Sequence, residues 1–219
     1  MNYENTRKTV LEAILEAVEK GLINGTSGNI AMRDPENPNI VAITPSGIPY
    51  TGMTPGDIAI VEMKEDGTNE WIEGPFKPSS ELPMHTAVLR ARKDVNATVH
   101  THSMNATICA MGENPELRPI TPPQCEFTPV AIVGFTMPGS NEVAAKVAAA
   151  IGEKGRVCLI KNHGMFSCGK NMKAAMHATI YTEEMAQTTV IAKTLGTYEP
   201  MPREAEAAMQ ALIAADQAV

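Results

Sequence analysis

The strongest constraint on the fold comes from two pairs of short apolar segments, each pair flanking a cluster of turn-forming residues. The segments NIAMR and NIVAIT lie on either side of DPENPN, and DIAIVEM and NEWIEG lie on either side of KEDGT. Short apolar runs separated by Asn, Asp, Gly and Pro are typical of antiparallel hairpins. The first half of the chain therefore predicts a sheet in which neighbouring strands run antiparallel.

Helical patterns alternate with these strands along the chain. Apolar residues at helical spacing predict a helix over residues 4–20, and similar patterns predict helices over residues 81–92, 141–153, 171–195 and 202–218. Further strands are expected within residues 97–103, 130–135 and 156–169. Together these elements predict one α/β domain over residues 1–219, an α/β/α sandwich whose helices cover a largely antiparallel central sheet.

Composition places the chain among ordinary globular proteins. Apolar residues make up 43% and charged residues 20% of its 219 residues. A formal net charge of -7 disfavours a nucleic-acid partner, which requires a basic surface. The sequence has neither a secretory signal pattern nor an apolar run of the roughly 20 residues that cross a bilayer, so we expect a cytoplasmic protein without a membrane partner. Its four widely spaced cysteines are expected to be buried thiols.

Three of the five histidines lie where a metal ion could be held. His100 and His102 alternate on a predicted strand, so both side chains point to the same face, about 7 Å apart along the backbone. A catalytic zinc site takes three protein ligands and leaves one position open, and His163, in the turn KNHGM, is the best third ligand. The alternative for the HxH pair is packing, and the alternative third ligand is His85, which more simply packs or forms a hydrogen bond.

Glu81 is the acidic residue that we single out as a candidate for chemistry. It stands in the first turn of a predicted helix, and the chain returns from that helix to His100 and His102. Position alone favours a helix-capping role, because carboxylates are stabilised at helix N-termini. The preceding serines, Ser79 and Ser80, can cap the same helix.

Three short loops rich in Gly, Ser and Thr have the composition of a phosphate site. They are residues 26–29, residues 44–47, and Ser79 with Ser80 before a helix. Exposed backbone N–H groups, hydroxyls and a helix N-terminus together can bind a phosphate group. Each loop alone is more often a simple turn, but their combination with the HxH strand favours a phosphate site.

The motifs GTSGN, TPSGIPY, PSSE, HTH and NHG, in this order, resemble the class II aldolase and adducin family from about residue 5 to residue 195. The resemblance implies that Glu81 is a catalytic acid/base that can also approach the metal, and that the metal is Zn²⁺, with Mn²⁺ or Co²⁺ as alternatives. Its implied zinc ligands are His100, His102 and His163. Its implied phosphate-binding residues are Asn29, Gly47, Ser79 and Ser80, with Thr26, Ser27 and Ser46 nearby.

The implied activity is that of a zinc-dependent lyase of carbohydrate metabolism. It would cleave a ketose 1-phosphate, such as L-fuculose 1-phosphate or a related deoxy-sugar phosphate, to dihydroxyacetone phosphate and an aldehyde. The resemblance also implies a homotetramer with active sites at subunit interfaces. Aldolases of this family use two tyrosines at the aldehyde end, yet residues 118–129 and the tail after Tyr198 contain none. Glu126, which lies in the first of these segments, is the replacement that we consider, and the absence of both tyrosines implies an aldehyde partner that differs from that of the fuculose enzyme.

Other functions remain open at this point. A sugar-phosphate 4-epimerase of the same family would carry Asp at position 81, which favours the aldolase. A dehydratase or a decarboxylase of a phosphorylated sugar could keep Glu81. A non-catalytic adducin-like scaffold would lose the histidines, and a cupin would lack the long helices.

Overall fold

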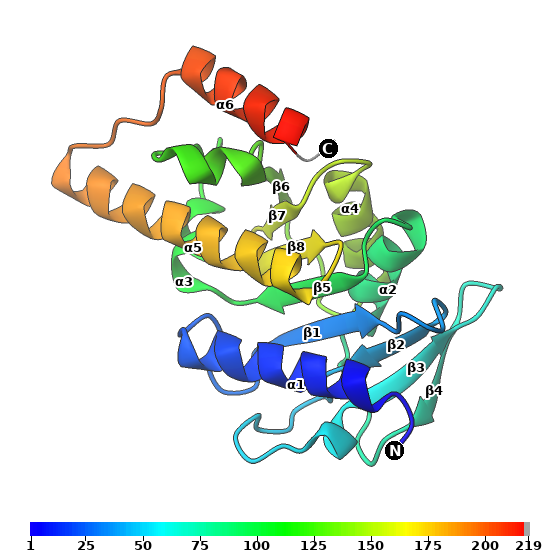
Figure 1. The fold of residues 1–219 in the computed structure, drawn as a ribbon. Coiled ribbons are helices and arrows are strands. Elements are labelled where there is room, and N and C mark those ends of the chain that lie inside the picture. The colour runs from blue at the N-terminus through cyan, green and yellow to red at the C-terminus, as the bar shows by residue number, and fades with distance from the viewer. Residues whose placement is uncertain (217–219) are drawn as a thin grey trace.

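A computed structural model describes residues 1–216 as one eight-stranded sheet with helices on both faces (Figure 1). The strand order is β4-β3-β2-β1-β5-β8-β7-β6, and only the β6–β7 pair among these strands is parallel. Both predicted hairpins are present, as β1–β2 and β3–β4. The strands are β1 (Gly28–Arg33), β2 (Ile40–Ile43), β3 (Ala59–Met63), β4 (Asn69–Glu73), β5 (Ala97–Thr101), β6 (Ala131–Val133), β7 (Val157–Ile160) and β8 (Gly164–Gly169).

The helices follow the predicted patterns closely. They are α1 (Glu4–Glu19), α2 (Leu82–Ala91), α3 (Met104–Cys109), α4 (Asn141–Ile151), α5 (Met172–Leu195) and α6 (Arg203–Asp216). The predicted end of the last helix, at residues 217 and 218, lies outside the described residues. Two short 3-10 helices, η1 (Pro55–Asp57) and η2 (Pro122–Phe127), stand in segments whose Pro content predicted loops.

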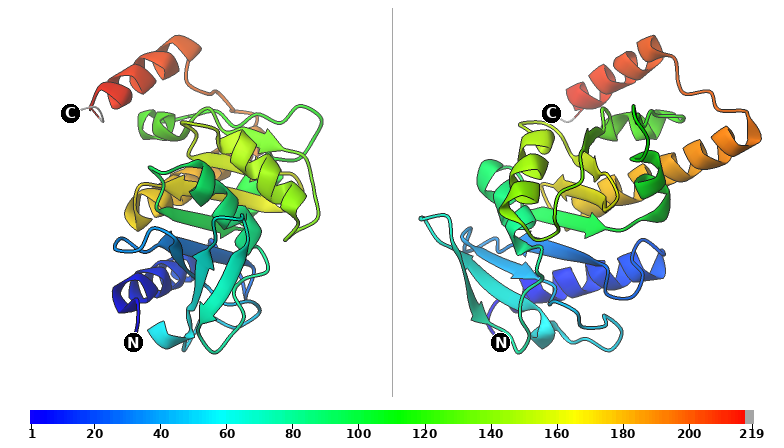
Figure 2. Two further views of the ribbon diagram at one scale, coloured as in Figure 1. Left: turned by 90° about the vertical axis from the view of Figure 1, so that its right-hand side faces the viewer. Right: turned by 180° about the vertical axis from the view of Figure 1, so that it is seen from behind.

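Two apolar layers hold the helices to the sheet. On one face, α1 and α5 pack on the sheet through residues such as Ile14, Val99 and Met176. On the other face, α2 and α4 pack on it through residues such as Leu89 and Val147. Figure 2 shows α1 and α4 on opposite sides of the sheet. Burying each such side chain stabilises the fold by about 1.5–3 kcal/mol. Helices on both faces of a largely antiparallel sheet confirm the predicted α/β/α architecture.

The cysteines behave as small apolar residues. Cys125, Cys158 and Cys168 are buried and Cys109 is half-buried, and all four are free thiols. Within residues 1–216, none of the helices combines the length and the apolar character needed to cross a membrane.

Strand β5 lies at the centre of the sheet, between β1 and β8. Asn29 of β1 is paired directly with His100 of β5, so the first Gly-rich loop and the HxH segment meet at neighbouring strand positions. The other neighbour, β8, begins immediately after His163. The sheet therefore brings three of the sequence motifs to the same ends of adjacent strands.

Candidate metal centre

His100 is fixed by the sheet. Its ring is completely buried, and its Nδ1 donates a hydrogen bond to the carbonyl oxygen of Met165 on β8, at 2.9 Å. Because a carbonyl only accepts, Nδ1 carries a proton, and Nε2, which points into the site, is the nitrogen available to a metal ion. His102 lies one residue beyond the end of β5 and is exposed, but its ring centroid is only 5.0 Å from that of His100.

His163 enters from the turn between β7 and β8. Asn162, just before it, adopts a left-handed conformation with φ 54°, which Asn tolerates better than most residues. A Cβ on Gly164 would stand 2.2 Å from the carbonyl oxygen of Thr101, so only glycine allows this close approach to the end of β5. The His163 ring consequently lies 4.8 Å from His100 and 5.1 Å from His102, measured between centroids.

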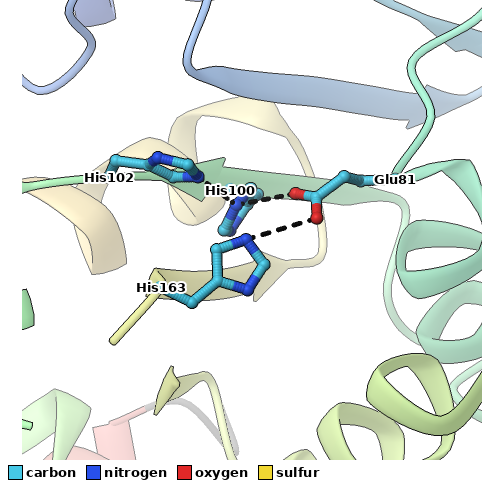
Figure 3. Close-up of side chains that lie close together, drawn as sticks. All are labelled: Glu81, His100, His102 and His163. Atoms are coloured by element: carbon cyan, nitrogen blue, oxygen red, sulfur yellow. Dashed lines mark hydrogen bonds and ion pairs between the residues drawn. The ribbon is translucent and has the colours of Figure 1, made fainter. Parts of the chain in front are cut away.

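Glu81 completes the cluster from the start of α2. It is the N-cap residue of that helix, but its side chain makes no capping hydrogen bond, so the capping role favoured by its position is wrong. Its Oε2 lies 2.8 Å from Nε2 of His100, and its Oε1 lies 3.2 Å from Nε2 of His163 (Figure 3). The hydroxyl of Ser79 accepts a hydrogen bond from the backbone N–H of Glu81 instead.

The electrostatics keep this carboxylate ionised. Burial alone would raise the pKa of Glu81, but hydrogen bonds and attraction from His100 and His163 hold that pKa below its usual value. Although His102 is exposed as a residue, its ring is partly removed from water among the other histidines, and this desolvation, followed by repulsion from His100 and His163, lowers its pKa to about 4. A metal ion binds ionised carboxylates and unprotonated imidazole nitrogens, so the lowered pKa values of Glu81 and His102 favour metal binding.

The donor set fits a divalent ion. Ligand atoms of Glu81, His100, His102 and His163 all lie within 4.8 Å of one another. Neither Lys nor Arg belongs to this cluster, so within it the carboxylate of buried Glu81 faces only histidines. Imidazole nitrogens with one carboxylate oxygen are ligands that zinc and neighbouring transition metals prefer. The structure thus brings together the three histidines and the acid that the sequence singled out.

A cavity of about 220 Å³ opens beside this cluster. All the residues predicted for phosphate line it, and so do Glu81 and His102 of the metal cluster. The described lining contains no Lys or Arg, so hydroxyls, an amide and backbone groups supply its polar surface. The lining residues from the three loops include Thr26, Ser27, Asn29, Ser46, Gly47, Ser79 and Ser80.

Backbone hydrogen bonds join the second and third loops. The N–H of Ser46 donates to the carbonyl of Lys77 at 2.9 Å, and the N–H of Ser79 donates to the carbonyl of Thr44 at 3.0 Å. Helix α2 begins directly after the third loop, so its positive N-terminal end lies at the cavity. Such an end favours an anion.

The structure adds residues that the sequence motifs contained without a role. Tyr50, the last residue of TPSGIPY, is buried, lines the cavity and donates its hydroxyl proton to the carbonyl of Gly28. Pro138 also lines the cavity. His85 is outside the metal cluster and hydrogen-bonds Asn29 and Thr98, so its role as an alternative ligand is not supported, whereas a hydrogen-bonding role is.

Glu126 lies elsewhere in the chain. It forms an ion pair with Arg156 at 2.9 Å and lines a separate cavity of about 810 Å³ beside α6. Within one chain the structure does not bring it to the metal cluster or to the phosphate-type cavity.

Comparison with known proteins gives a consistent result. Residues 8–190 match the model of the class II aldolase and adducin N-terminal domain. The chain is 34% identical over 190 residues to a 5-methylthioribulose-1-phosphate/5-deoxyribulose-1-phosphate aldolase of Rhodospirillum rubrum, covering 83% of this chain and 78% of that protein. It is 33% identical to a 5-deoxy-D-ribulose 1-phosphate aldolase of Bacillus thuringiensis, covering 93% of each. A solved L-fuculose 1-phosphate aldolase superposes with a TM-score of 0.86 at 28% identity, covering 97% of this chain and 98% of that one.

Proposed function

The chain belongs to the class II aldolase and adducin family and is an aldolase of that class, and we propose that it cleaves a ketose 1-phosphate to dihydroxyacetone phosphate and an aldehyde. One observation carries the proposal: the Glu81 and histidine cluster opens into a cavity whose lining offers neutral hydrogen-bond donors beside a helix N-terminus. A metal centre next to an anion site suits a substrate with a carbonyl near its phosphate.

The metal would be held by His100, His102 and His163, with Zn²⁺ as the proposed ion. When bound, the ion supplies a positive charge that stabilises the negative charge developing on the substrate oxygens as a proton or an aldehyde leaves. The buried His100 holds its Nε2 toward the site through its Nδ1 hydrogen bond to Met165. This preorganisation favours binding without rearrangement of the sheet.

Glu81 is the proposed acid/base. Its carboxylate is buried and ionised, and it borders the cavity in which the reacting carbons would lie. In the condensation direction it would accept a proton from the hydroxymethyl carbon of dihydroxyacetone phosphate. In the cleavage direction the hydroxyl that becomes the aldehyde carbonyl loses a proton as the carbon–carbon bond breaks, and Glu81, protonated at that stage, would deliver a proton to the same carbon of dihydroxyacetone phosphate.

The phosphate end would be bound by Asn29, Gly47, Ser79 and Ser80, with Thr26 and Ser46 close by. Backbone N–H groups, hydroxyls and the N-terminus of α2 would donate to the phosphate oxygens. Because these groups are uncharged, the helix terminus and the adjacent metal would provide the positive potential.

For the aldehyde end, we propose a short apolar aldehyde such as acetaldehyde, which 5-deoxyribulose 1-phosphate would release. Two relatives named for 5-deoxyribulose 1-phosphate are 34% and 33% identical to the chain, and a relative named as an L-fuculose phosphate aldolase is 32% identical, so the choice between the two substrates rests on the residues at the aldehyde end. The chain also lacks tyrosine in residues 118–129 and after Tyr198, where hydroxyls would contact a polar aldehyde. Phe135 and Met137, both exposed, lie three residues and one residue before the cavity-lining Pro138, and they would offer apolar contacts to such an aldehyde.

The test is a direct comparison of two substrates. The metal-loaded protein should cleave 5-deoxyribulose 1-phosphate with a higher kcat/KM than L-fuculose 1-phosphate, and a chelator should abolish both reactions. Equal or reversed preference would refute the apolar aldehyde end, while cleavage of neither substrate would refute the ketose 1-phosphate assignment.

Two alternatives are weaker on specific residues. A 4-epimerase of this family would carry Asp at position 81, where the chain has Glu, and a scaffold would not need the complete set of histidines. A homotetramer with interface active sites stays a prediction, which sedimentation of the purified protein would test.

A further inference from the structure

A buried row of three polar side chains leads from the centre of the sheet to the phosphate-type cavity. His85 of α2 stands in its middle, with Nδ1 2.7 Å from the hydroxyl of Thr98 and Nε2 against Oδ1 of Asn29. His85 and Thr98 are completely buried, and Asn29 is 6% exposed. The proposed reaction assigns no step to His85. Burying three polar side chains in an apolar layer costs free energy, and a role in the site would explain why they are there.

The protonation of the ring follows from its neighbours. Burial, and then repulsion from His100, lowers the pKa of His85 to about 3, so the ring is neutral near pH 7. A neutral imidazole has one donor and one acceptor nitrogen. The Thr98 hydroxyl lies 2.7 Å from Nδ1, and its other acceptor, the carbonyl of Ala31, is at 3.5 Å. The hydroxyl therefore donates to Nδ1, and Nε2 carries the ring proton and donates to Asn29.

This direction determines what Asn29 presents to the cavity. An amide offers one oxygen acceptor and one NH₂ donor, and the oxygen of Asn29 is engaged by His85. The NH₂ group is then left for a ligand in the cavity that Asn29 lines. If the amide rotated by half a turn, its oxygen would face the phosphate oxygens and repel them.

We propose that His85 is a positioning residue that locks the amide of Asn29 with its NH₂ group toward the substrate phosphate. The inference rests on the proposed function, because it requires the phosphate to occupy this cavity. Phe166 packs against the ring, with centroids 5.3 Å apart, and helps to fix its orientation. Since Asn29 is paired with His100 across β1 and β5, the lock also sets the amide relative to the metal cluster.

The first test is binding of inorganic phosphate to the metal-loaded protein, measured by calorimetry. In His85→Gln the side-chain amide reaches the position of Nε2 and can still donate to Asn29, whereas in His85→Asn it reaches only the position of Nδ1. We expect His85→Asn and His85→Leu to weaken phosphate binding about tenfold, and His85→Gln to restore most of it, since one buried hydrogen bond is concerned. His177→Gln, at an exposed histidine of α5 outside this cavity, is the matched control.

The second test needs no variant. Nitrogen NMR of the wild-type protein should show the proton of the His85 ring on Nε2 and none on Nδ1. A proton on Nδ1, or equal phosphate affinity in His85→Gln and His85→Asn, would overturn the positioning role. If the wild type bound no phosphate, both the phosphate site and the positioning role would be refuted; binding that is unaffected by all three His85 variants would refute only the latter.

The kinetic consequence separates positioning from a general structural defect. Loss of the His85–Asn29 hydrogen bond in His85→Asn and His85→Leu should raise the KM for the phosphorylated substrate more than it lowers kcat. The metal content of these variants should equal that of the wild type. A fall in kcat with an unchanged KM would contradict the inference.

Discussion

The two ends of the candidate site are built on opposite principles. At the metal end, side chains from rigid elements converge: His100 from β5, His163 from the β7–β8 turn and Glu81 from the start of α2, all less than 9% exposed. At the phosphate end, three loops contribute hydroxyls, an amide and backbone groups, and Thr26, Ser46 and Ser80 are exposed.

The difference concerns how binding energy is distributed. The metal end concentrates it in four ligating groups, and each of them has a position that the sheet or a helix terminus determines. The phosphate end spreads it over many uncharged donors, each worth about 0.5–1.5 kcal/mol. Single substitutions should therefore abolish function at the first end and only weaken it at the second.

The largest effect is expected from His100→Ala. Removing the buried ligand should reduce the metal content far below the wild-type level and lower kcat/KM at least about 1,000-fold, because several kcal/mol of charge stabilisation are lost. Metal analysis by mass spectrometry and a cleavage assay measure both quantities. His177→Ala is the control at a histidine outside the cluster, and a metal-free His100→Ala protein with full activity would contradict the comparison.

Glu81→Gln should have the next largest effect. The three histidines keep the metal, but the amide cannot accept the substrate proton, so exchange of that proton should slow about 100- to 10,000-fold. The measurement is loss of the hydroxymethyl proton signal of dihydroxyacetone phosphate in D₂O. Unchanged exchange in a metal-loaded Glu81→Gln protein would refute the role of Glu81 as base.

Ser80→Ala should have a smaller effect at the phosphate end. Loss of one exposed hydroxyl among several donors should raise the KM for the phosphorylated substrate about three- to tenfold with little change in kcat. Steady-state kinetics at constant ionic strength would measure this ratio. A loss as large as that of His100→Ala would show that the two ends do not differ as described.

The last prediction concerns the pH dependence of stability rather than catalysis, through His85, which links the two ends. Its folded-state pKa of about 3 lies below its ordinary value of 6.5, so the unfolded chain binds a proton that the folded chain excludes. The stabilisation present above pH 6.5 is therefore lost as the pH falls toward 3. Between pH 6 and 4 the free energy of unfolding of the metal-free wild type should fall by about 1.4 kcal/mol per pH unit more than that of His85→Gln. Urea titrations of both proteins at several pH values would measure this difference. An equal change in the free energy of unfolding with pH in the two proteins would contradict the prediction.

Sequence patterns predicted the elements and the residue types of the site well, because both follow local rules. The turn clusters predicted the β1–β2 and β3–β4 hairpins, and the HxH spacing predicted that the rings of His100 and His102 lie close together at the end of β5. The turn KNHGM contains Asn162, whose left-handed conformation aims His163 at that strand. The family resemblance, rather than spacing, suggested Glu81 as an acid/base.

Local sequence patterns did not predict contacts between segments that are distant in the chain. His85 and Asn29 are 56 positions apart, and the bond between them depends on how α2 packs on β1 and β5. The same holds for Tyr50, whose hydroxyl reaches Gly28 across two loops. The capping role favoured for Glu81 failed for a related reason, since the attraction of two histidines from distant strands outweighs a local helix-end interaction.

X-ray absorption spectroscopy at the zinc edge of the metal-loaded protein tests the proposed ligand set most directly. Three imidazole nitrogens and an oxygen ligand are expected at about 2.0–2.2 Å, and His163→Ala should lose one imidazole contribution. Sulfur scattering at about 2.3 Å, or an imidazole number unchanged in His163→Ala, would contradict the proposed metal centre.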